Sequence, residues 1–341
     1  LYIIRLMSVW RPEVLRGFDR NFWILSFGWF IAALGFAISI PFLSIYFSTQ
    51  LGLSTSEIGL FFVGIAVVRA ISQAVGGELS DRIGRFGLVI HSQTVRSLSF
   101  VALGLAVGFN WGFWWVAILF GVNAILGSLF MPAVMALVSD LLPPEKRLNG
   151  YSIARSASNL GWAVGPAIGG FMATSSYASL FYISAILSFG SMIVFRLFFK
   201  PPPIVANPDR FRYSDLLAVK DDKLLAVHAG LTLILYLVVA QLIAPFSLYT
   251  VGMRGIPEHQ LGMLFTLNGL FVVLLQFPVT RLLSHLSFTT QLAAGSFLYF
   301  IGYGLVGFMG SFWQFAFAIL VVTLGEVTMS PPGLTLTSRL A

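Results

Sequence analysis

The sequence predicts an all-α protein that crosses a membrane many times and arranges its helices in two bundles. Three observations support this fold class. Hydrophobic residues make up 57% of the chain and charged residues only 10%, whereas soluble domains have about 45–50% and about 25%. Ten apolar runs are long enough for a spanning helix, which needs about 20 mostly apolar residues. The basic residues gather on alternate connections between these runs, as the positive-inside rule expects.

Each apolar run is continuous, which favours helices, because the strands of a membrane β-barrel are shorter and alternate between polar and apolar residues. The first run contains no charged residue at all. In order along the chain, the predicted spanning helices are 22–47, 57–79, 87–109, 112–139, 149–173, 177–199, 223–250, 259–283, 288–310 and 312–339.

The basic residues predict that the N-terminus is cytoplasmic. Four arginines precede or begin the first predicted helix, and Arg82, Lys146 and Lys200 stand in connections on the same side. Connections on the opposite side contain only Arg254, and this asymmetry orients helices in a membrane. We therefore expect a multi-pass integral protein of the plasma membrane, in contact with the lipid bilayer. Because the basic residues are spread in this way, the net charge of +7 does not indicate a nucleic-acid partner.

A polar, proline-rich stretch predicts the boundary between the two bundles. Residues 201–222 open with three prolines, and this composition is typical of a linker between domains. We expect an N-terminal six-helix bundle in residues 1–200, a cytoplasmic linker in 201–222, and an incomplete C-terminal bundle of four helices in 223–341.

The second bundle resembles the first in its sequence pattern. A shift of 199 residues, the difference between Phe113 and Phe312, also places Pro132 on Pro331. Parallel repeats of this kind generate two equal halves in transporters. Because two further helices would complete the second half, we expect that the last two of twelve helices are missing at the C-terminal end.

A charged motif lies where the second predicted helix leads into the third. It consists of Gly77, Asp81, Arg82, Gly84 and Arg85, and we call it the gate motif. Gly84 can make the turn without a steric penalty, and the Asp81 carboxylate can face a helix N-terminus or a neighbouring arginine. Such charges can hold the cytoplasmic ends of two bundles together in one state and separate in another. An ordinary hairpin turn with positive-inside charges explains the same residues equally well.

Glycines recur every four residues in the fifth predicted helix. The fifth-helix motif comprises Gly161, Gly165, Pro166, Gly169 and Gly170. Small residues at this spacing let two helix backbones approach closely, and Pro166 frees a backbone carbonyl and can bend the helix. Ordinary helix packing accounts for most such motifs, but a close and bendable contact also suits two bundles that rock against each other.

Both motifs resemble signatures of the major facilitator superfamily. The gate motif is similar to the family's loop signature, except that Phe86 stands where the family usually has a basic residue. The fifth-helix motif looks like that of the drug:proton antiporter branch. The resemblance implies two six-helix bundles around a central cavity, efflux in exchange for protons, and a monomer. A fourth-helix arginine that the family links to proton transfer is missing here, and Asn123 is the nearest polar residue.

Four residues place a charged or titratable group inside predicted spanning helices. Charge there costs at least about 2.5–3.5 kcal/mol on insertion scales, which makes it a functional candidate. Glu326, near the middle of the tenth helix, is the first candidate for a proton carrier, because its surroundings can tune a carboxyl group between charged and neutral forms. A structural ion pair is the alternative role. Arg69 can pair with Glu326 or attract an anionic substrate, and it can also reach towards the lipid headgroups or pair with Glu78 or Asp81. His228 titrates in a suitable range, and Arg96 is expected to be structural.

Amide side chains are the candidates for lining the cavity. Asn123, Gln241, Asn268 and Gln276 all fall within predicted helices, where amides either contact substrate or join neighbouring helices. Few charges accompany them, which favours a lipophilic small molecule as the substrate.

The sequence contains no cysteine, and it shows no P-loop, metal-ligand cluster or nucleophile–base pair. We therefore expect neither an enzyme nor an ATP-driven pump, and no metal or other cofactor. The predicted function is secondary active transport of a small molecule by alternating access, as drug:proton antiport. A metabolite or sugar symporter or uniporter on the same fold would instead show uptake. A non-transporting membrane protein derived from a transporter would show no flux.

Overall fold

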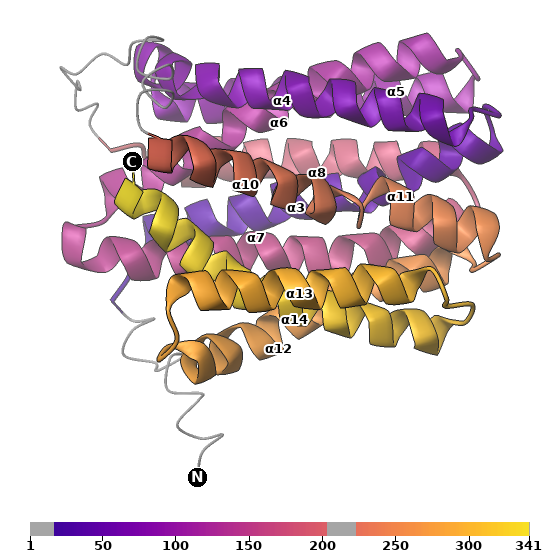
Figure 1. Cartoon of the computed structure of the whole chain (residues 1–341). Helices are drawn as coiled ribbons and strands as arrows, with labels where there is room; N and C mark the ends of the chain where they lie inside the picture. Colours follow the sequence, from indigo (N-terminus) through magenta and orange to yellow (C-terminus); the bar gives the residue numbers. More distant parts are fainter. Residues whose placement is uncertain (1–16, 203–222, 341) are drawn as a thin grey trace.

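The computed structural model describes residues 17–202 and 223–340, and every regular element in these ranges is a helix (Figure 1). The helices of the first half are α3 (Arg20–Thr49), α4 (Thr55–Ile83), α5 (Arg85–Gly108), α6 (Phe113–Leu141), α7 (Pro144–Ala173) and α8 (Tyr177–Phe198). Those of the second half are α10 (Lys223–Ala240), α11 (Ala244–Ser247), the π-helix η3 (Leu248–Met253), α12 (Glu258–Leu283), α13 (Phe288–Val306) and α14 (Phe312–Leu340).

The structure confirms the predicted all-α membrane fold. Each predicted range falls on one helix, except that 223–250 falls on the broken run of α10, α11 and η3. Eight helical segments within the described ranges are long and apolar enough to cross a membrane. The helices α7 and α13 are not among them, because glycine and polar residues recur along α7 and because α13 has Thr289, Thr290 and Gln291 near its start. The count of ten spans is therefore not confirmed.

Local sequence explains where several helices begin. Ser54 caps α4 and forms a capping box with Glu57, and the side chains of Asp19 and Ser287 accept backbone hydrogen bonds at the starts of α3 and α13. These bonds satisfy N–H groups that the first turn of a helix leaves free. Gly84 makes the turn between α4 and α5 with a φ of 86°, which glycine adopts without a steric penalty, as the sequence predicted.

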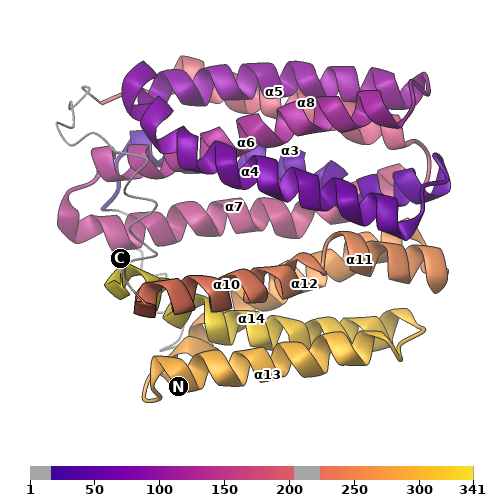
Figure 2. The same cartoon turned by 45° about the horizontal axis from the view of Figure 1, so that its top comes forward.

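The helices of each half pack against one another, and an extensive contact between α7 and α12 joins the halves. In the first half, α3 packs against α7 and α8, α5 packs against α6 and α8, and α4 covers α6. In the second half, α13 packs against α14, and α14 also packs against α12. The main contact between the halves runs along α7 and α12. Figure 2 shows α7 between the other helices of the first half and those of the second.

The predicted internal repeat is visible in the helix boundaries. The helices α6 and α14 both contain 29 residues, and the shift that places Phe113 on Phe312 also places Leu141 on Leu340. In the first half, α6 packs against α4 and α5. In the second half, α14 packs against α12 and α13, which are the helices equivalent to α4 and α5. The domain limits at residues 200 and 223 stay a prediction, because most of the predicted linker lies outside the described ranges.

One apolar cluster joins the two halves at the end of the molecule where α7 ends and α12 begins. There the ring of Phe171 stacks on His259 with centroids 5.7 Å apart, and the Tyr177 hydroxyl donates a hydrogen bond of 3.2 Å to Glu258 Oε1. With the N-terminus in the cytoplasm, this would be the external end. Buried members of the cluster include Ile38, Phe42, Leu180, Phe246, Leu261 and Phe315.

Candidate functional site

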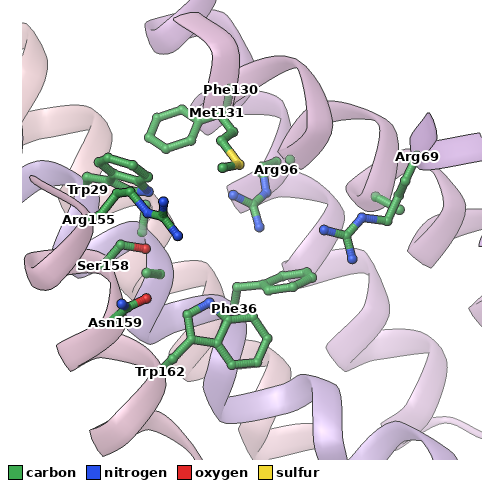
Figure 3. A pocket seen from close by; sticks show the side chains of 14 residues that line it. Trp29, Phe36, Arg69, Arg96, Phe130, Met131, Arg155, Ser158, Asn159 and Trp162 are labelled. Atoms are coloured by element: carbon green, nitrogen blue, oxygen red, sulfur yellow. The ribbon is translucent and has the colours of Figure 1, made fainter. Parts of the chain in front are cut away.

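A cavity of about 230 Å³ lies within the first half, between α3, α4, α5, α6 and α7 (Figure 3). Three arginines and four large aromatic side chains dominate its lining, and we call it the arginine pocket. The lining residues are Trp29, Ala32, Ala33, Phe36, Arg69, Arg96, Ala124, Gly127, Phe130, Met131, Arg155, Ser158, Asn159 and Trp162.

Three different helices bring guanidinium groups to this pocket. Arg69 comes from α4, Arg96 from α5 and Arg155 from α7. Figure 3 shows the side chains of Arg96 and Arg155 turned toward the same opening, with Arg69 farther along. Among the described residues, no carboxylate lines the pocket or forms an ion pair with any of the three. The pocket therefore holds concentrated positive charge without a described counter-ion.

Arg96 is the most enclosed of the three arginines. It is only 4% exposed, and its Nε has no hydrogen-bond partner. Its Cζ lies 5.2 Å from the ring centroid of Phe36 and 5.8 Å from that of Phe100, while Arg69 Cζ lies 5.9 Å from Phe36. Such cation–π contacts contribute about 0.5–2 kcal/mol each. They offset part of the cost of the charge but leave a hydrogen-bond donor unsatisfied.

Small residues make room for the guanidinium groups. A Cβ atom added to Gly127 on α6 would lie 3.4 Å from Arg96 Cζ, so Gly127 lies directly beside the guanidinium group. Ala32, Ala33 and Ala124 line other parts of the wall. The pocket is thus open because the helices carry short side chains where they face one another.

The largely apolar cavity that the sequence favoured stays a prediction, because the arginine pocket is a cavity within the first half. Sequence reasoning singled out Arg69 as a cavity or pairing residue and expected Arg96 to be structural, and both line the pocket. Arg155 was not a sequence candidate. Its charge inside the predicted helix 149–173 is the signal that marks it, because charge in a spanning helix is costly.

Glu326 lies on α14 and outside the arginine pocket. Asn268 on α12 donates hydrogen bonds of 2.8 Å to Thr323 Oγ1 and 3.4 Å to Glu326 Oε2. Tyr299 and Tyr303 on α13 are close enough to interact electrostatically with the carboxylate. The predicted pairing with Arg69 is not present, and no other described cation forms an ion pair with Glu326.

The repeat relates Glu326 to the arginine pocket. The shift of 199 residues places Gly127 on Glu326 and Arg69 on Asn268. In the first half, the α6 position holds a glycine beside a guanidinium group. In the second half, the equivalent α14 position holds a carboxyl group beside an amide. At these equivalent positions, the first half therefore has a cation where the second half is neutral, and the second half has an acid where the first half has glycine.

The predicted amide candidates do not line the arginine pocket. Asn123 is fully buried and donates 2.8 Å to Ser99 Oγ, joining α6 to α5, while Gln276 donates 3.1 Å to the Val327 carbonyl, joining α12 to α14. These contacts are the interhelical alternative that the sequence left open. Gln241 is exposed in the turn after α10, and His228 is half-buried on α10. Any role for them in the cavity stays a prediction.

The gate motif lies at the junction of α4 and α5. Gly77, Asp81 and Arg82 belong to the C-terminal end of α4, and Arg85 begins α5. Arg85 forms an ion pair with Asp140 at the end of α6. Because α5 and α6 belong to the same half, this pair ties the start of α5 to the end of α6 within the first half. A latch between the bundles stays a prediction.

The fifth-helix motif lies on α7 and faces two partners. A Cβ added to Gly165 would lie 2.6 Å from Ala37 Cβ of α3, and Gly161 and Gly169 also face α3. On the other face, a Cβ at Gly170 would lie 2.5 Å from the Glu258 carbonyl oxygen of α12. The resemblance implied that the motif shapes the contact between the halves. The structure places the regularly spaced glycines against α3 of the same half, and Gly170 against the other half.

Comparisons with known proteins agree with this architecture. The sequence profile of the Major Facilitator Superfamily matches residues 25–341. The chain is 26% identical to the uncharacterized MFS-type transporter YqjV of Bacillus subtilis, over 90% of this chain and 75% of YqjV. It is also 26% identical to the quinolone resistance protein NorA of Staphylococcus aureus, over 92% of this chain and 80% of NorA.

Solved structures share the fold at lower sequence identity. A POT family transporter in complex with 5-aminolevulinic acid has a TM-score of 0.70 at 16% identity, covering 95% of this chain and 84% of that one. The nucleoside transporter NupG has a TM-score of 0.76 at 11% identity, covering 93% and 82%. At such identities the likeness concerns the fold alone.

Proposed function

Because this chain belongs to the Major Facilitator Superfamily, a family of membrane transporters, we propose that it exports a small molecule in exchange for protons. Alternating access would come from the two halves rocking about the contact of α7 with α12, which exposes the site to each side in turn. Glu326 is the proposed proton carrier, with Arg69 and His228 as the other candidates in the proton path.

The relatives and the fifth-helix motif support export rather than uptake. NorA is named for resistance to quinolones, and removal of a drug from the cell is the transport activity that gives resistance. The glycines of α7 also resemble the drug:proton antiporter signature. The helix α7 packs closely against both α3 and α12, because small residues let helix backbones approach each other. This position suits a helix about which the two halves rock.

The observation that carries the proton coupling is the position of Glu326. It is a carboxyl group in a spanning segment, with an amide and tyrosines around it and no ion pair to a described cation. A charge there costs about 2.5–3.5 kcal/mol on insertion scales. A carboxyl group can remove that cost by binding a proton, and a second conformation can restore its charge.

The energy of one proton is sufficient for concentrative transport. A proton that crosses 100 mV gains about 2.3 kcal/mol. Since about 1.4 kcal/mol corresponds to a tenfold ratio, one proton supports roughly a 40-fold gradient of a neutral substrate.

The test is transport by the full protein in liposomes, with wild type compared with Glu326→Gln. The substrate panel contains a quinolone, a lipophilic cation and an aromatic carboxylate. Glutamine mimics the protonated carboxyl group but cannot exchange its proton. We expect the variant to lose accumulation driven by a pH gradient while it keeps exchange of labelled for unlabelled substrate without a gradient.

Glu57→Gln is the matched control, because Glu57 is exposed and glutamine also completes a capping box. It should keep both activities. Unchanged accumulation in Glu326→Gln would remove Glu326 from the mechanism and direct attention to His228. No flux of any compound by the wild-type protein, beside an active reference transporter, would favour the non-transporting alternative.

A further inference from the structure

We propose that the arginine pocket binds a small aromatic organic anion, whose acidic group is held by Arg96 and Arg155 and whose ring packs against the aromatic wall. This inference rests on the proposed function in one respect, since it names the substrate class of the transporter. It also departs from the lipophilic substrate that the sequence favoured.

Charge is the first argument. Three guanidinium groups line one cavity of about 230 Å³, and no described carboxylate accompanies them. Arg69 and Arg96 are also near enough to repel each other. A cationic compound would add to this repulsion, and a neutral one would leave it in place. An anion lowers it, because it brings the opposite charge to the guanidinium groups, and the attraction is strongest at the buried Arg96.

Hydrogen bonding is the second argument. Arg96 is 4% exposed, and its Nε lacks a partner. Buried polar groups are usually hydrogen-bonded in folded proteins, so the Arg96 Nε–H, like a few other buried polar atoms of the described chain, is available to an acceptor that enters the pocket. Figure 3 shows the side chains of Arg96 and Arg155 converging from two helices. Guanidinium groups bind carboxylate, phosphonate and sulfonate oxygens with paired, charge-assisted hydrogen bonds.

The remaining wall defines the rest of the ligand. Trp29, Phe36, Phe130 and Trp162 contribute aromatic surface, which suits an aromatic ring better than an inorganic ion. The volume is smaller than the roughly 300–1,000 Å³ of ordinary ligand pockets. A single ring with one or two acidic groups therefore fits the observations better than a large drug.

The experiment measures binding of radiolabelled benzoate, salicylate and phthalate to the full protein in nanodiscs of neutral lipid. Neutral lipid removes anionic headgroups as an alternative occupant. Benzamide and trimethylphenylammonium serve as neutral and cationic competitors of similar size, and inorganic phosphate as an anion without a ring. We expect saturable binding of at least one aromatic anion, with little competition from the other three compounds.

Arg155→Gln is the main variant, because Arg155 is exposed and its loss should not disturb folding. A charge-assisted hydrogen bond is worth enough that affinity should fall at least about tenfold. Arg155→Lys should lose less, since it keeps the charge but not the planar fork. Arg96→Gln should resemble Arg155→Gln. Arg196→Gln, which removes an equal charge at the end of α8 outside the pocket, should bind as wild type does.

Three results would overturn the proposal: no saturable binding of any aromatic anion, unchanged affinity in Arg155→Gln, or equal competition by trimethylphenylammonium or phosphate. The test is independent of proton coupling, because Glu326→Gln should still bind the anion. Binding without proton-driven flux would refute the proposed function and keep this inference. Proton-driven flux of a cation, without anion binding, would do the opposite.

Discussion

At the scale of single residues, Arg96 has an environment that serves a ligand better than it serves the fold. Its guanidinium group lies against Phe36 and Phe100 and lacks a described counter-ion. Burial of a charge in a spanning helix costs about 2.5–3.5 kcal/mol, and two cation–π contacts of about 0.5–2 kcal/mol each return about 1–4 kcal/mol. These contacts balance much of the cost, but they leave the Arg96 Nε–H without an acceptor, which the structural role that the sequence suggested does not explain.

The residue scale gives a prediction about stability. Arg96→Met keeps an unbranched apolar stem and removes the guanidinium charge, so the variant should unfold at the same or a higher temperature. Arg254→Met is the contrast, because Arg254 donates bonds of 2.8 Å to the Tyr249 hydroxyl and 2.9 Å to the Gly307 carbonyl. Losing these should cost about 0.5–1.5 kcal/mol each. Thermal unfolding in detergent measures both, and a larger loss for Arg96→Met would indicate a structural role.

At the scale of elements, α7 packs against a different helix on each of two faces. Its evenly spaced glycines allow α3 to approach within the first half, and Gly170 allows α12 to approach across the halves. The helix also carries Arg155 into the pocket. A movement of α7 relative to α12 would therefore change the shape of the arginine pocket, because α7 forms both part of the pocket wall and the contact with α12.

The element scale predicts a cost for filling the α3 contact. Gly165→Ala should destabilise the protein by about 1–3 kcal/mol, because the added Cβ would lie 2.6 Å from Ala37 Cβ and overpacking strains the helices. Gly190→Ala on α8 is the matched control, since no atom lies within 4 Å of its added Cβ. That variant should be neutral or gain up to about 1 kcal/mol from helix propensity. Equal unfolding temperatures for the two variants would contradict the tight contact.

At the scale of the whole molecule, the two halves repeat a packing scheme but differ in charge. Gly127 in the first half corresponds to Glu326 in the second, and Asn268 and Gly295 stand at the positions equivalent to Arg69 and Arg96. A negative carrier in one half and a positive binding site in the other suit exchange, because proton and anion would bind to different groups. If the membrane potential is 100 mV, negative inside, a monovalent anion that moves out of the cell also gains about 2.3 kcal/mol.

The orientation of the molecule is predicted and can be measured directly. Because the chain has no cysteine, single cysteines can be introduced without a background signal. Ser311 and Ser284 are exposed at opposite ends of α13. With a cytoplasmic N-terminus, Ser311→Cys should react with a membrane-impermeant maleimide added to intact cells. Ser284→Cys should react only after the membrane is opened, and the reverse pattern would invert the topology.

The sequence by itself determined the helices, because the signals for them are local. Apolar runs fix where the chain can cross lipid, and capping residues such as Ser54 and turn glycines such as Gly84 fix where helices begin and end. The same local reading identified Glu326 as a charge inside a helix. The spans at α7 and α13 are not confirmed, because these helices are less apolar than the other eight.

Only the tertiary structure decided which charges meet. Arg69, Arg96 and Arg155 lie on three helices that are not consecutive in sequence, and their shared pocket depends on how α4, α5 and α7 rotate and pack. The same holds for Asn268, which contacts Glu326, and for Asn123, which joins α5 to α6 instead of lining the pocket. Periodicity states which residues share a face of one helix, but side-chain packing between helices decides what that face meets.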